Sequence, residues 1–363
     1  MTAGTRTAKL RERLLAENAD AIAVTSVPNI AYCTGFRGVF DDEPAHVALV
    51  GAAGAALFTD SRYFEALTVA ARGSEWEVRL VRESLTSAVA DELRLADAAR
   101  LALETSLPYA RFQAFAKEHD GEVVETTGWV EELRAVKDAD EVSAIVQAQA
   151  LTDRAFDHLV SCVLRRGVSE RDVALELEFY LRREGSEGVA FAPIVASGPN
   201  AALPHATPSD RRLAKGDFVV VDFGARVGGY CSDMTRTVVI GGATERHREI
   251  YDAVLAANGA GLAAVAAGRM GRDIDAPARA VIAERGFGDF FGHGLGHGVG
   301  LEVHEQPGVG PRSEGAVPLG AVITVEPGIY IPGYGGVRIE DLVVVEETGG
   351  RVLTRSAKNL IEL

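Results

Sequence analysis

Cysteine is scarce in this chain, with only Cys33, Cys162 and Cys231 among 363 residues. An odd number of widely separated cysteines argues against a disulfide framework and favours reduced thiols. Apolar runs of roughly 20 residues, the length of a membrane span, are also absent. The polar start, MTAGTRTAKLRERLLAENAD, has no apolar core of the kind that signal peptides carry. These absences predict a cytoplasmic protein that is neither exported nor embedded in a membrane.

Basic residues are outnumbered by acidic residues. Lys and Arg number 37 against 52 Asp and Glu, and no basic run stands out. Because nucleic-acid-binding surfaces need such a basic footprint, we expect no DNA or RNA partner. Hydrophobic residues make up 47% and charged residues 25%, a balance typical of a globular protein. The length exceeds that of one ordinary core and predicts two domains.

The first 130 residues alternate helix-like and strand-like segments, which predicts a small α/β domain. The helical patterns cover residues 6–18, 61–71, 86–95 and 109–119, and the strand-like ones 21–26, 46–50, 55–60, 76–81 and 100–105. A strongly charged stretch, WVEELRAVKDADE, then leads into a long helical pattern that we expect to end at Gly167, as at a helix C-cap. We therefore expect domains at residues 1–130 and 131–363.

The second half contains an internal repeat. The segments 167–185 and 268–286 have equal length, begin and end with Gly, and carry Arg-Asp followed by Val or Ile at the same offset. A long helical pattern precedes each copy, and a strand-rich Gly/Pro segment follows each. Chance similarity between two amphipathic helices is the alternative. The matching order of the following strands favours two helix–helix–strand–strand halves related by a pseudo-two-fold axis.

Acidic residues interrupt the apolar strands that follow each copy. In FVVVDFGARVGGYCSDMTRTVVI, the turn at 227–229 predicts a β-hairpin in which Asp222 and Asp233 oppose each other. Two such close carboxylates repel unless a cation or a shared proton neutralises them. The alternative places one Asp in a turn and the other in a salt bridge with Arg226 or Arg236.

Glu326 in ITVEPGIY and Glu340 in GVRIEDLVVV repeat this arrangement, and Pro327 predicts an irregular or edge strand there. The pseudo-two-fold brings the four carboxylates toward one place. Two divalent cations, roughly 3.5 to 4 Å apart and sharing a water, would match their charge.

The segment FGHGLGHGVGLEVHE adds His293, His297 and His304. Its glycines exclude a stable helix, so the spacing is not the helical zinc signature HExxH. We interpret them as an open backbone that approaches a ligand. One imidazole among four carboxylates suits Mn²⁺, with Co²⁺, Fe²⁺ or Zn²⁺ as alternatives. Ordinary surface or core histidines are the competing interpretation.

These motifs resemble the pita-bread metallopeptidases, specifically the Xaa-Pro dipeptidases (prolidases) and Xaa-Pro aminopeptidases. SVPNIAYCTGF and LFTDSRYFEAL also resemble their leading domain. The resemblance implies an α+β fold: a C-terminal pita-bread catalytic domain with a pseudo-two-fold ααββ repeat, preceded by a smaller creatinase-like α/β domain. It implies five metal ligands, which are Asp222, Asp233, His297, Glu326 and Glu340.

The same resemblance assigns His205, His293 and His304 to the shell that faces the substrate. It implies that Glu326 takes a proton from the metal-bridging water, giving a hydroxide that attacks the scissile carbonyl. Tyr330 and Arg338 would orient the carboxylate ligands, although surface or packing roles are equally open for them.

The expected substrates are short proline-containing peptides. An Xaa-Pro dipeptidase is favoured by the compact length, and an aminopeptidase acting on longer peptides is the alternative. A metal-free creatinase-like hydrolase and a non-catalytic pita-bread binding protein are more distant alternatives. The resemblance also implies a homodimer.

Overall fold

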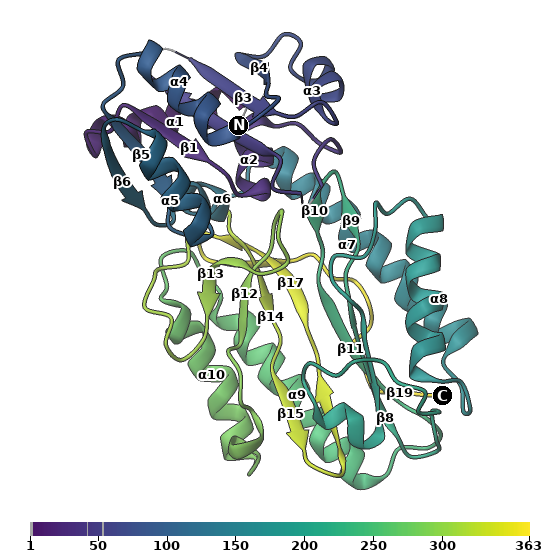
Figure 1. The fold of residues 1–363 in the computed structure, drawn as a ribbon. Helices are drawn as coiled ribbons and strands as arrows, with labels where there is room; N and C mark the ends of the chain where they lie inside the picture. The colour runs from purple at the N-terminus through teal and green to yellow at the C-terminus, as the bar shows by residue number, and fades with distance from the viewer. Residues whose placement is uncertain (1–2, 42, 53) are drawn as a thin grey trace. The chain divides into compact units, whose positions relative to one another are not determined.

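The computed structural model describes residues 3–41, 43–52 and 54–363 and divides the chain into two compact units, Met1–Arg134 and Ala135–Leu363 (Figure 1). Each unit has its own buried apolar cluster, so each is described by itself. Within the described residues, no helix has the length and apolarity needed to cross a membrane.

The first unit is built on one six-stranded sheet with the order β4-β3-β2-β1-β5-β6. The β1–β2 and β2–β3 pairs are antiparallel, and the other neighbours are parallel. Its strands are β1 (Ala21–Val24), β2 (His46–Gly51), β3 (Ala55–Thr59), β4 (Trp76–Leu80), β5 (Arg100–Glu104) and β6 (Glu122–Thr126). Its helices are α1 (Ala3–Ala16), α2 (Val27–Thr34), α3 (Phe64–Ala70), α4 (Leu85–Leu95), α5 (Tyr109–Glu118) and α6 (Trp129–Ala135).

The alternation of helix and strand that the sequence predicts for this unit is confirmed. Strand β1 is buried along its whole length, as expected of a short apolar run in the middle of a sheet. Three elements were not anticipated: α2, β6 and α6. Helix α2 has Pro28 in its first turn. It is terminated by Gly35, the residue after its last turn, which has a φ of 70°.

The second unit contains the repeat. Its first half comprises α7 (Ala139–His158), a π-helical turn η1 (Leu159–Val163), α8 (Glu170–Arg183), β7 (Ile194–Ser197), the 3₁₀ turn η2 (Gly198–Ala202), β8 (Phe218–Phe223), β9 (Arg226–Val227), β10 (Tyr230–Cys231) and β11 (Met234–Val239). The second half comprises α9 (Glu245–Ala264), α10 (Gly271–Glu284), the 3₁₀ turn η3 (Gly288–Phe290), β12 (Gly296–Gly298), β13 (Glu305–Val309), β14 (Val322–Val325), β15 (Gly328–Ile331), β16 (Gly335–Arg338), β17 (Asp341–Glu346) and β18 (Gly349–Val352), followed by β19 (Ile361–Glu362).

The lengths of the helices confirm the repeat. Helices α7 and α9 each have 20 residues, and α8 and α10 each have 14. The predicted helix end at Gly167 is wrong: α7 ends at His158 and passes into η1, which has no counterpart after α9. The apolar pattern of residues 159–163 continues through this wider turn, which sequence periodicity does not distinguish from an α-helix.

Each helix pair packs on its own strands. Buried side chains of α7 and α8 form one cluster with β8 and β11, and those of α9 and α10 form another with β14 and β17. Figure 1 shows α8 and α10 on opposite sides of this unit. The strands form a sheet of order β19-β11-β8-β7 and a sheet of order β13-β12-β14-β17-β18.

Both hairpins are interrupted where their acidic residues lie. The first interruption places residues 224–225 opposite 232–233, between the β8–β11 ladder and the β9–β10 ladder. The second places residues 326–327 opposite 339–340, between the β14–β17 and β15–β16 ladders. The irregular strand predicted at Pro327 is therefore confirmed.

The predicted pairing of Asp222 with Asp233 is wrong. Asp222 pairs with Thr235, in the same register as the Val227–Tyr230 pair that closes a two-residue Gly-Gly turn. The register shifts by two, so the two aspartates keep the same face as diagonal neighbours.

Candidate active site and metal centre

Four carboxylates reach the site from the two interruptions or from the strand end beside them. Asp222 lies near the end of β8, and Asp233 directly precedes β11. Glu326 directly follows β14, and Glu340 directly precedes β17. Extending the registers on either side places Glu326 and Glu340 opposite each other within the second interruption. Each half of the repeat thus supplies two acidic side chains.

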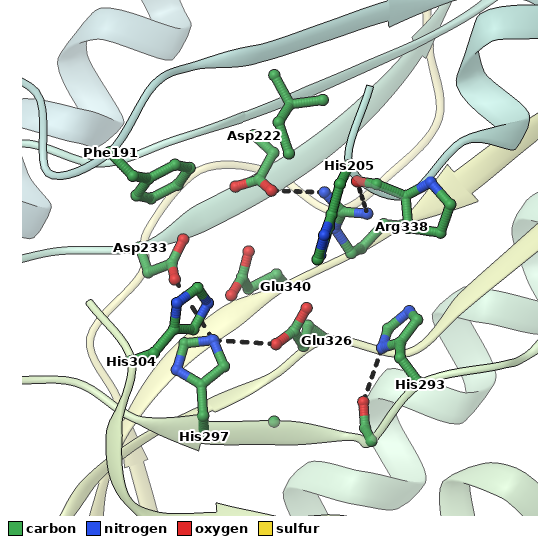
Figure 2. A pocket seen from close by; sticks show the side chains of 14 residues that line it. Phe191, His205, Asp222, Asp233, His293, His297, His304, Glu326, Arg338 and Glu340 are labelled. Carbon is green, nitrogen blue, oxygen red and sulfur yellow. Dashed lines mark hydrogen bonds and ion pairs between the residues drawn. The ribbon is translucent and has the colours of Figure 1, made fainter. Parts of the chain in front are cut away.

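These side chains line a cavity of about 350 Å³ within the second unit (Figure 2). The cavity contains nearly all the residues that the sequence predicts for the site: Asp222, Asp233, His297, Glu326, Glu340, His205, His293, His304 and Arg338. Phe191, Ile194 and Pro204 add an apolar wall that the sequence did not indicate. Tyr330 does not line the cavity but is hydrogen-bonded to Arg338, which does.

Three of the five expected metal ligands already have a coordinating arrangement. Ligand atoms of Asp233, His297 and Glu340 all lie within 4.8 Å of one another. His297 Nε2 is 3.2 Å from Glu326 Oε1 and 3.7 Å from Asp233 Oδ2. A cation placed among these atoms would meet one imidazole and several carboxylate oxygens, a donor set suited to first-row divalent metals.

Among the side chains that line the cavity, two buried carboxylate oxygens have no hydrogen-bond partner in the described structure. They are Asp222 Oδ1 and Glu340 Oε1. A buried carboxylate oxygen without a partner is costly, so native proteins usually satisfy it with a donor or a metal ion. Both oxygens belong to expected ligands, and the residues present therefore fit a cation pair.

The electrostatics of the site require neutralisation. Burial, followed by the charges of Glu340 and Asp222, raises the pKa of Asp233 well above its ordinary value. Burial and the neighbouring Glu326 likewise raise the pKa of Glu340. For Asp222, burial raises the pKa despite the opposing charge of Arg338. Without cations, these three carboxyl groups therefore resist ionisation.

Glu326 and His297 behave as an ion pair. Burial acts to raise the pKa of Glu326, but the hydrogen bond and positive charge of His297 lower it to about 2. Burial disfavours the charged form of His297, yet the bond to Glu326 raises its pKa. A metal-bound histidine must lose this Nε2 proton, so metal binding here would be accompanied by proton release.

A buried hydrogen-bond network holds the carboxylates. Arg338 donates from one terminal nitrogen to Asp222 Oδ2, and its Nε donates to Thr235 Oγ1 at 2.9 Å. Thr235 in turn donates to Glu340 Oε2 at 2.7 Å. The guanidinium thus links ligands from both halves of the repeat.

Tyr330 connects this network to His293. Its hydroxyl accepts from Arg338 Nη1 at 2.7 Å and lies 3.0 Å from His293 Nε2. Arg338 and Tyr330 are only 3% and 7% exposed, so surface roles are excluded for both. Burial also lowers the pKa of His293, which favours a neutral ring.

The comparisons with known proteins agree with this geometry. Residues 143–347 match the model of metallopeptidase family M24, and residues 6–136 match that of the creatinase/prolidase N-terminal domain. The chain belongs to metallopeptidase family M24. The resemblance to pita-bread peptidases and the α+β fold class expected from it are both confirmed.

Relatives of this M24 chain include characterised and uncharacterised peptidases. An uncharacterised peptidase of Bacillus subtilis (strain 168) is 42% identical, over 98% of this chain and 99% of that protein. The Xaa-Pro dipeptidase of Pyrococcus furiosus is 41% identical, over 72% of this chain and 75% of that protein. The solved Xaa-Pro dipeptidase from Bacillus anthracis has 39% identity and a TM-score of 0.94, with 100% of both chains covered.

An aminopeptidase is also among the similar solved structures. The X-Pro aminopeptidase from Thermotoga maritima has 36% identity and a TM-score of 0.87, over 97% of this chain and 99% of that one. Dipeptidases and aminopeptidases of this family thus share the architecture of this chain.

Sequence reasoning missed the threonines that hold Glu326 and Glu340 in this M24 peptidase. Thr235 bonds Glu340, and Thr324 Oγ1 donates to Glu326 Oε1 at 3.2 Å. Each threonine lies two residues from an acidic site residue, and residues two apart in a strand share a face. That spacing in SDMTRT and ITVEPG was the signal that could have identified them.

The glycines around His297 allow close packing of strands. A Cβ at Gly296 would lie 2.0 Å from the carbonyl oxygen of Thr324, and one at Gly298 would lie 2.2 Å from that of Gln306. This close packing fixes His297 between them, opposite β14. Gly296 also lines the cavity, and the approach of this backbone to a ligand stays a prediction.

Proposed function

We propose that this chain is a metal-dependent Xaa-Pro dipeptidase whose catalytic unit is Ala135–Leu363, with residues 1–134 as a leading domain. The observation that carries the proposal is the convergence of four carboxylates, three of them buried, and His297 on one cavity, with two carboxylate oxygens left without partners. Such a cluster is unfavourable without cations and well suited to them.

The proposed ligands are Asp222, Asp233, His297, Glu326 and Glu340, and the proposed cofactor is a pair of divalent ions. The oxygen-rich donor set favours Mn²⁺ over the softer alternatives. When bound, the cations would polarise the scissile carbonyl and lower the pKa of a water molecule.

The chain's own residues would handle protons and position the peptide. Glu326 is ionised and can accept a proton. The hydrogen bond from His297 lowers the pKa of Glu326 and makes it a weak base. Loss of the His297 proton on metal binding would remove that bond and make Glu326 a stronger base.

Burial lowers the pKa values of His293 and His304, which favours neutral rings for both. His304 would donate a hydrogen bond to the substrate or to a developing oxyanion. The single N–H of neutral His293 is held by the Gly294 carbonyl, 2.7 Å from Nδ1, so this ring would help to shape the same side of the cavity. His205 faces the same cavity.

The apolar wall suits a proline ring. Phe191, Ile194 and Pro204 line the same cavity as the polar cluster, and a pyrrolidine ring can pack against apolar side chains without any polar partner. The Xaa-Pro dipeptidases among the relatives and solved structures support a dipeptide substrate. The Thermotoga maritima aminopeptidase supports the second candidate, an enzyme that removes the first residue from longer peptides. A cytoplasmic location and a homodimer stay predictions from the sequence.

The test is hydrolysis of an Xaa-Pro dipeptide and an Xaa-Pro tripeptide by chelator-treated protein, before and after Mn²⁺ is added. We expect dipeptide cleavage that returns with Mn²⁺ in the parent, is lost in Asp233→Asn, and is retained in Asp210→Asn. Asp210 is a suitable control because its side chain is 80% exposed and pairs only with Arg171 in the described structure. Cleavage of the tripeptide alone would favour the aminopeptidase, and failure to bind Mn²⁺ would refute the metal site.

A further inference from the structure

Asn258 of α9 lies behind the cavity, fully buried, and bonds the backbone on both sides of the second interruption. Its side-chain nitrogen donates to the carbonyl oxygens of Val325, at 3.0 Å, and Ile339, at 3.3 Å. These carbonyls belong to the peptide groups that join directly to Glu326 and Glu340. One side-chain amide thus bridges the backbone immediately before both glutamates.

The same two peptide groups are also held at their N–H ends. The Glu326 N–H donates to the Leu295 carbonyl at 2.8 Å, and the Glu340 N–H donates to the Thr235 carbonyl at 3.1 Å. Because a peptide group is planar, fixing its C=O and its N–H fixes the orientation of the residue that follows. The interruption therefore has a defined shape, although neither glutamate takes part in a regular ladder.

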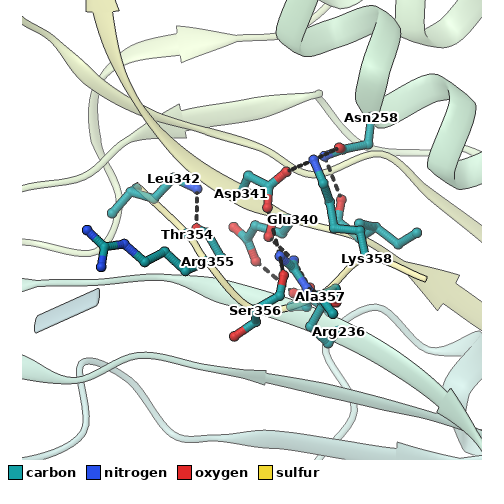
Figure 3. Close-up of polar contacts among 12 residues, drawn as sticks. Arg236, Asn258, Glu340, Asp341, Leu342, Thr354, Arg355, Ser356, Ala357 and Lys358 are labelled. Atoms are coloured by element: carbon teal, nitrogen blue, oxygen red, sulfur yellow. Dashed lines mark hydrogen bonds and ion pairs between the residues drawn. The ribbon is translucent and has the colours of Figure 1, made fainter. Parts of the chain in front are cut away.

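The orientation of the Asn258 amide is set by Lys358. Lys358 Nζ donates to Asn258 Oδ1 at 3.0 Å and to Asp341 Oδ2 at 2.7 Å (Figure 3). The ammonium group is only a donor, so the amide must present its oxygen to Lys358 and its NH₂ group to the two carbonyls. Arg236 completes the buried cluster by donating to Asp341 Oδ1 at 2.8 Å.

The first half of the repeat has a counterpart. Thr152 occupies the same position in α7, counted from the first residue, as Asn258 does in α9. Its hydroxyl accepts from the Ala225 N–H at 3.2 Å and lies 2.7 Å from Ser232 Oγ, the residue before Asp233. Both long helices therefore direct a buried polar side chain at the interruption of their own hairpin.

We propose that Asn258 and Thr152 are positioning residues that hold the two interruptions in the geometry required for cation binding. Neither touches the cavity, and each acts through the backbone beside an acidic residue. The inference rests on the proposed metal site. It also explains why both interruptions persist: each helix supplies partners for the backbone groups that the broken ladders leave unpaired.

A purely structural role is the competing explanation, and metal affinity separates the two. Thr354 provides a matched control, because its hydroxyl is buried and accepts the Leu342 N–H at 2.9 Å, on the regular part of β17. Asn258→Ala, Thr152→Val and Thr354→Val each remove a buried hydrogen bond. We expect all three to lower the unfolding temperature of the metal-free protein, because each breaks hydrogen bonds of buried polar groups.

The experiment titrates the chelator-treated full chain with Mn²⁺ alone by calorimetry. Asn258→Ala and Thr152→Val should weaken Mn²⁺ binding by about tenfold or more, the effect typical of residues that orient ligands, while Thr354→Val should bind as the parent does. Equal affinity in all four proteins would overturn the inference, and so would equal weakening in the control. If the parent itself binds no Mn²⁺, the proposed function fails first.

Lys358→Met gives a milder perturbation in case Asn258→Ala does not fold. The Lys358 side chain is 32% exposed, so its replacement leaves little cavity, and it frees the Asn258 amide to rotate. Weaker Mn²⁺ binding in this variant supports the inference, and parent-like binding contradicts it.

Discussion

Replacing Asp233 by Asn should make the metal-free protein more stable and the Mn²⁺-loaded protein less stable than the parent. Asp233 is 4% exposed, and burial together with the charges of Glu340 and Asp222 raises its pKa. Asparagine keeps the shape and removes the charge. This behaviour is expected of a site whose charges bind cations well but lower the stability of the metal-free protein.

The magnitude follows from the cost of ionising a buried carboxyl group. Each unit of pKa displacement corresponds to about 1.4 kcal/mol. Repulsion from the neighbouring carboxylates makes a gain of about 1–3 kcal/mol reasonable for the metal-free variant at pH 7. In a unit the size of Ala135–Leu363, that gain raises the midpoint of thermal unfolding by about 3–10 °C. In the parent, Mn²⁺ at 1,000 times its dissociation constant stabilises the folded state by about 4.1 kcal/mol, which exceeds this gain and which the variant largely loses.

The pH dependence has a defined sign. A carboxyl group whose pKa is raised by folding binds its proton more tightly in the folded state. Its contribution to stability is therefore present below the ordinary carboxyl pKa and is lost as pH rises toward the raised value. Asn cannot titrate, so the stability gap between Asp233→Asn and the parent should widen as pH rises from about 4 upward.

The assay is calorimetric unfolding in chelator from pH 4 to 8, repeated with Mn²⁺ at pH 7, with Asp210→Asn as a control that changes neither curve. The order of stability should reverse when Mn²⁺ is added. A metal-free Asp233→Asn protein that is less stable than the parent at pH 7, or a gap that does not change with pH, would refute the electrostatic argument.

Three further outcomes are expected. Arg338→Lys should lower Mn²⁺ affinity by about 10- to 100-fold in calorimetry, since an ammonium cannot reproduce the planar fork with which the guanidinium bonds Asp222, Thr235 and Tyr330 at once; parent-like affinity would contradict this. Tyr330→Phe and Thr324→Val each remove one hydroxyl from the network and should reduce kcat for an Xaa-Pro dipeptide less than Arg338→Lys does, as steady-state kinetics would show. Gly296→Ala should lower the unfolding temperature, because its Cβ would collide with a backbone oxygen 2.0 Å away, whereas Gly315→Ala, with nothing within 4 Å, should not; equal effects would argue against the packing explanation.

Much of the fold was readable from local patterns. The apolar periodicity of residues 6–119 located most elements of the first unit, and Gly-bounded segments of equal length revealed the repeat in the second. These features depend on interactions within a few residues, which a sequence displays directly. The π-helical turn η1 and the Gly-Gly turn were misread, because periodicity cannot separate a π turn from an α turn or fix a hairpin register.

The kinds of side chain that form the site could also be identified from the sequence. Four acidic residues embedded in apolar strands, with histidines in a Gly-rich segment between them, indicate a metal centre. The structure brings all of them to one cavity. Their roles as ligands, and those of His205, His293 and His304, stay proposals that the metal titrations address.

By itself, therefore, the sequence determined the family, the repeat and the identity of the side chains that can bind cations. Tertiary structure alone decided how those side chains are held. Arg338 reaches Asp222 across 116 positions, and Asn258 bridges carbonyls 67 and 81 positions away. Such contacts arise where strands and helices from distant parts of the chain pack together. No local pattern encodes them, because they depend on the register and packing of elements distant in the chain.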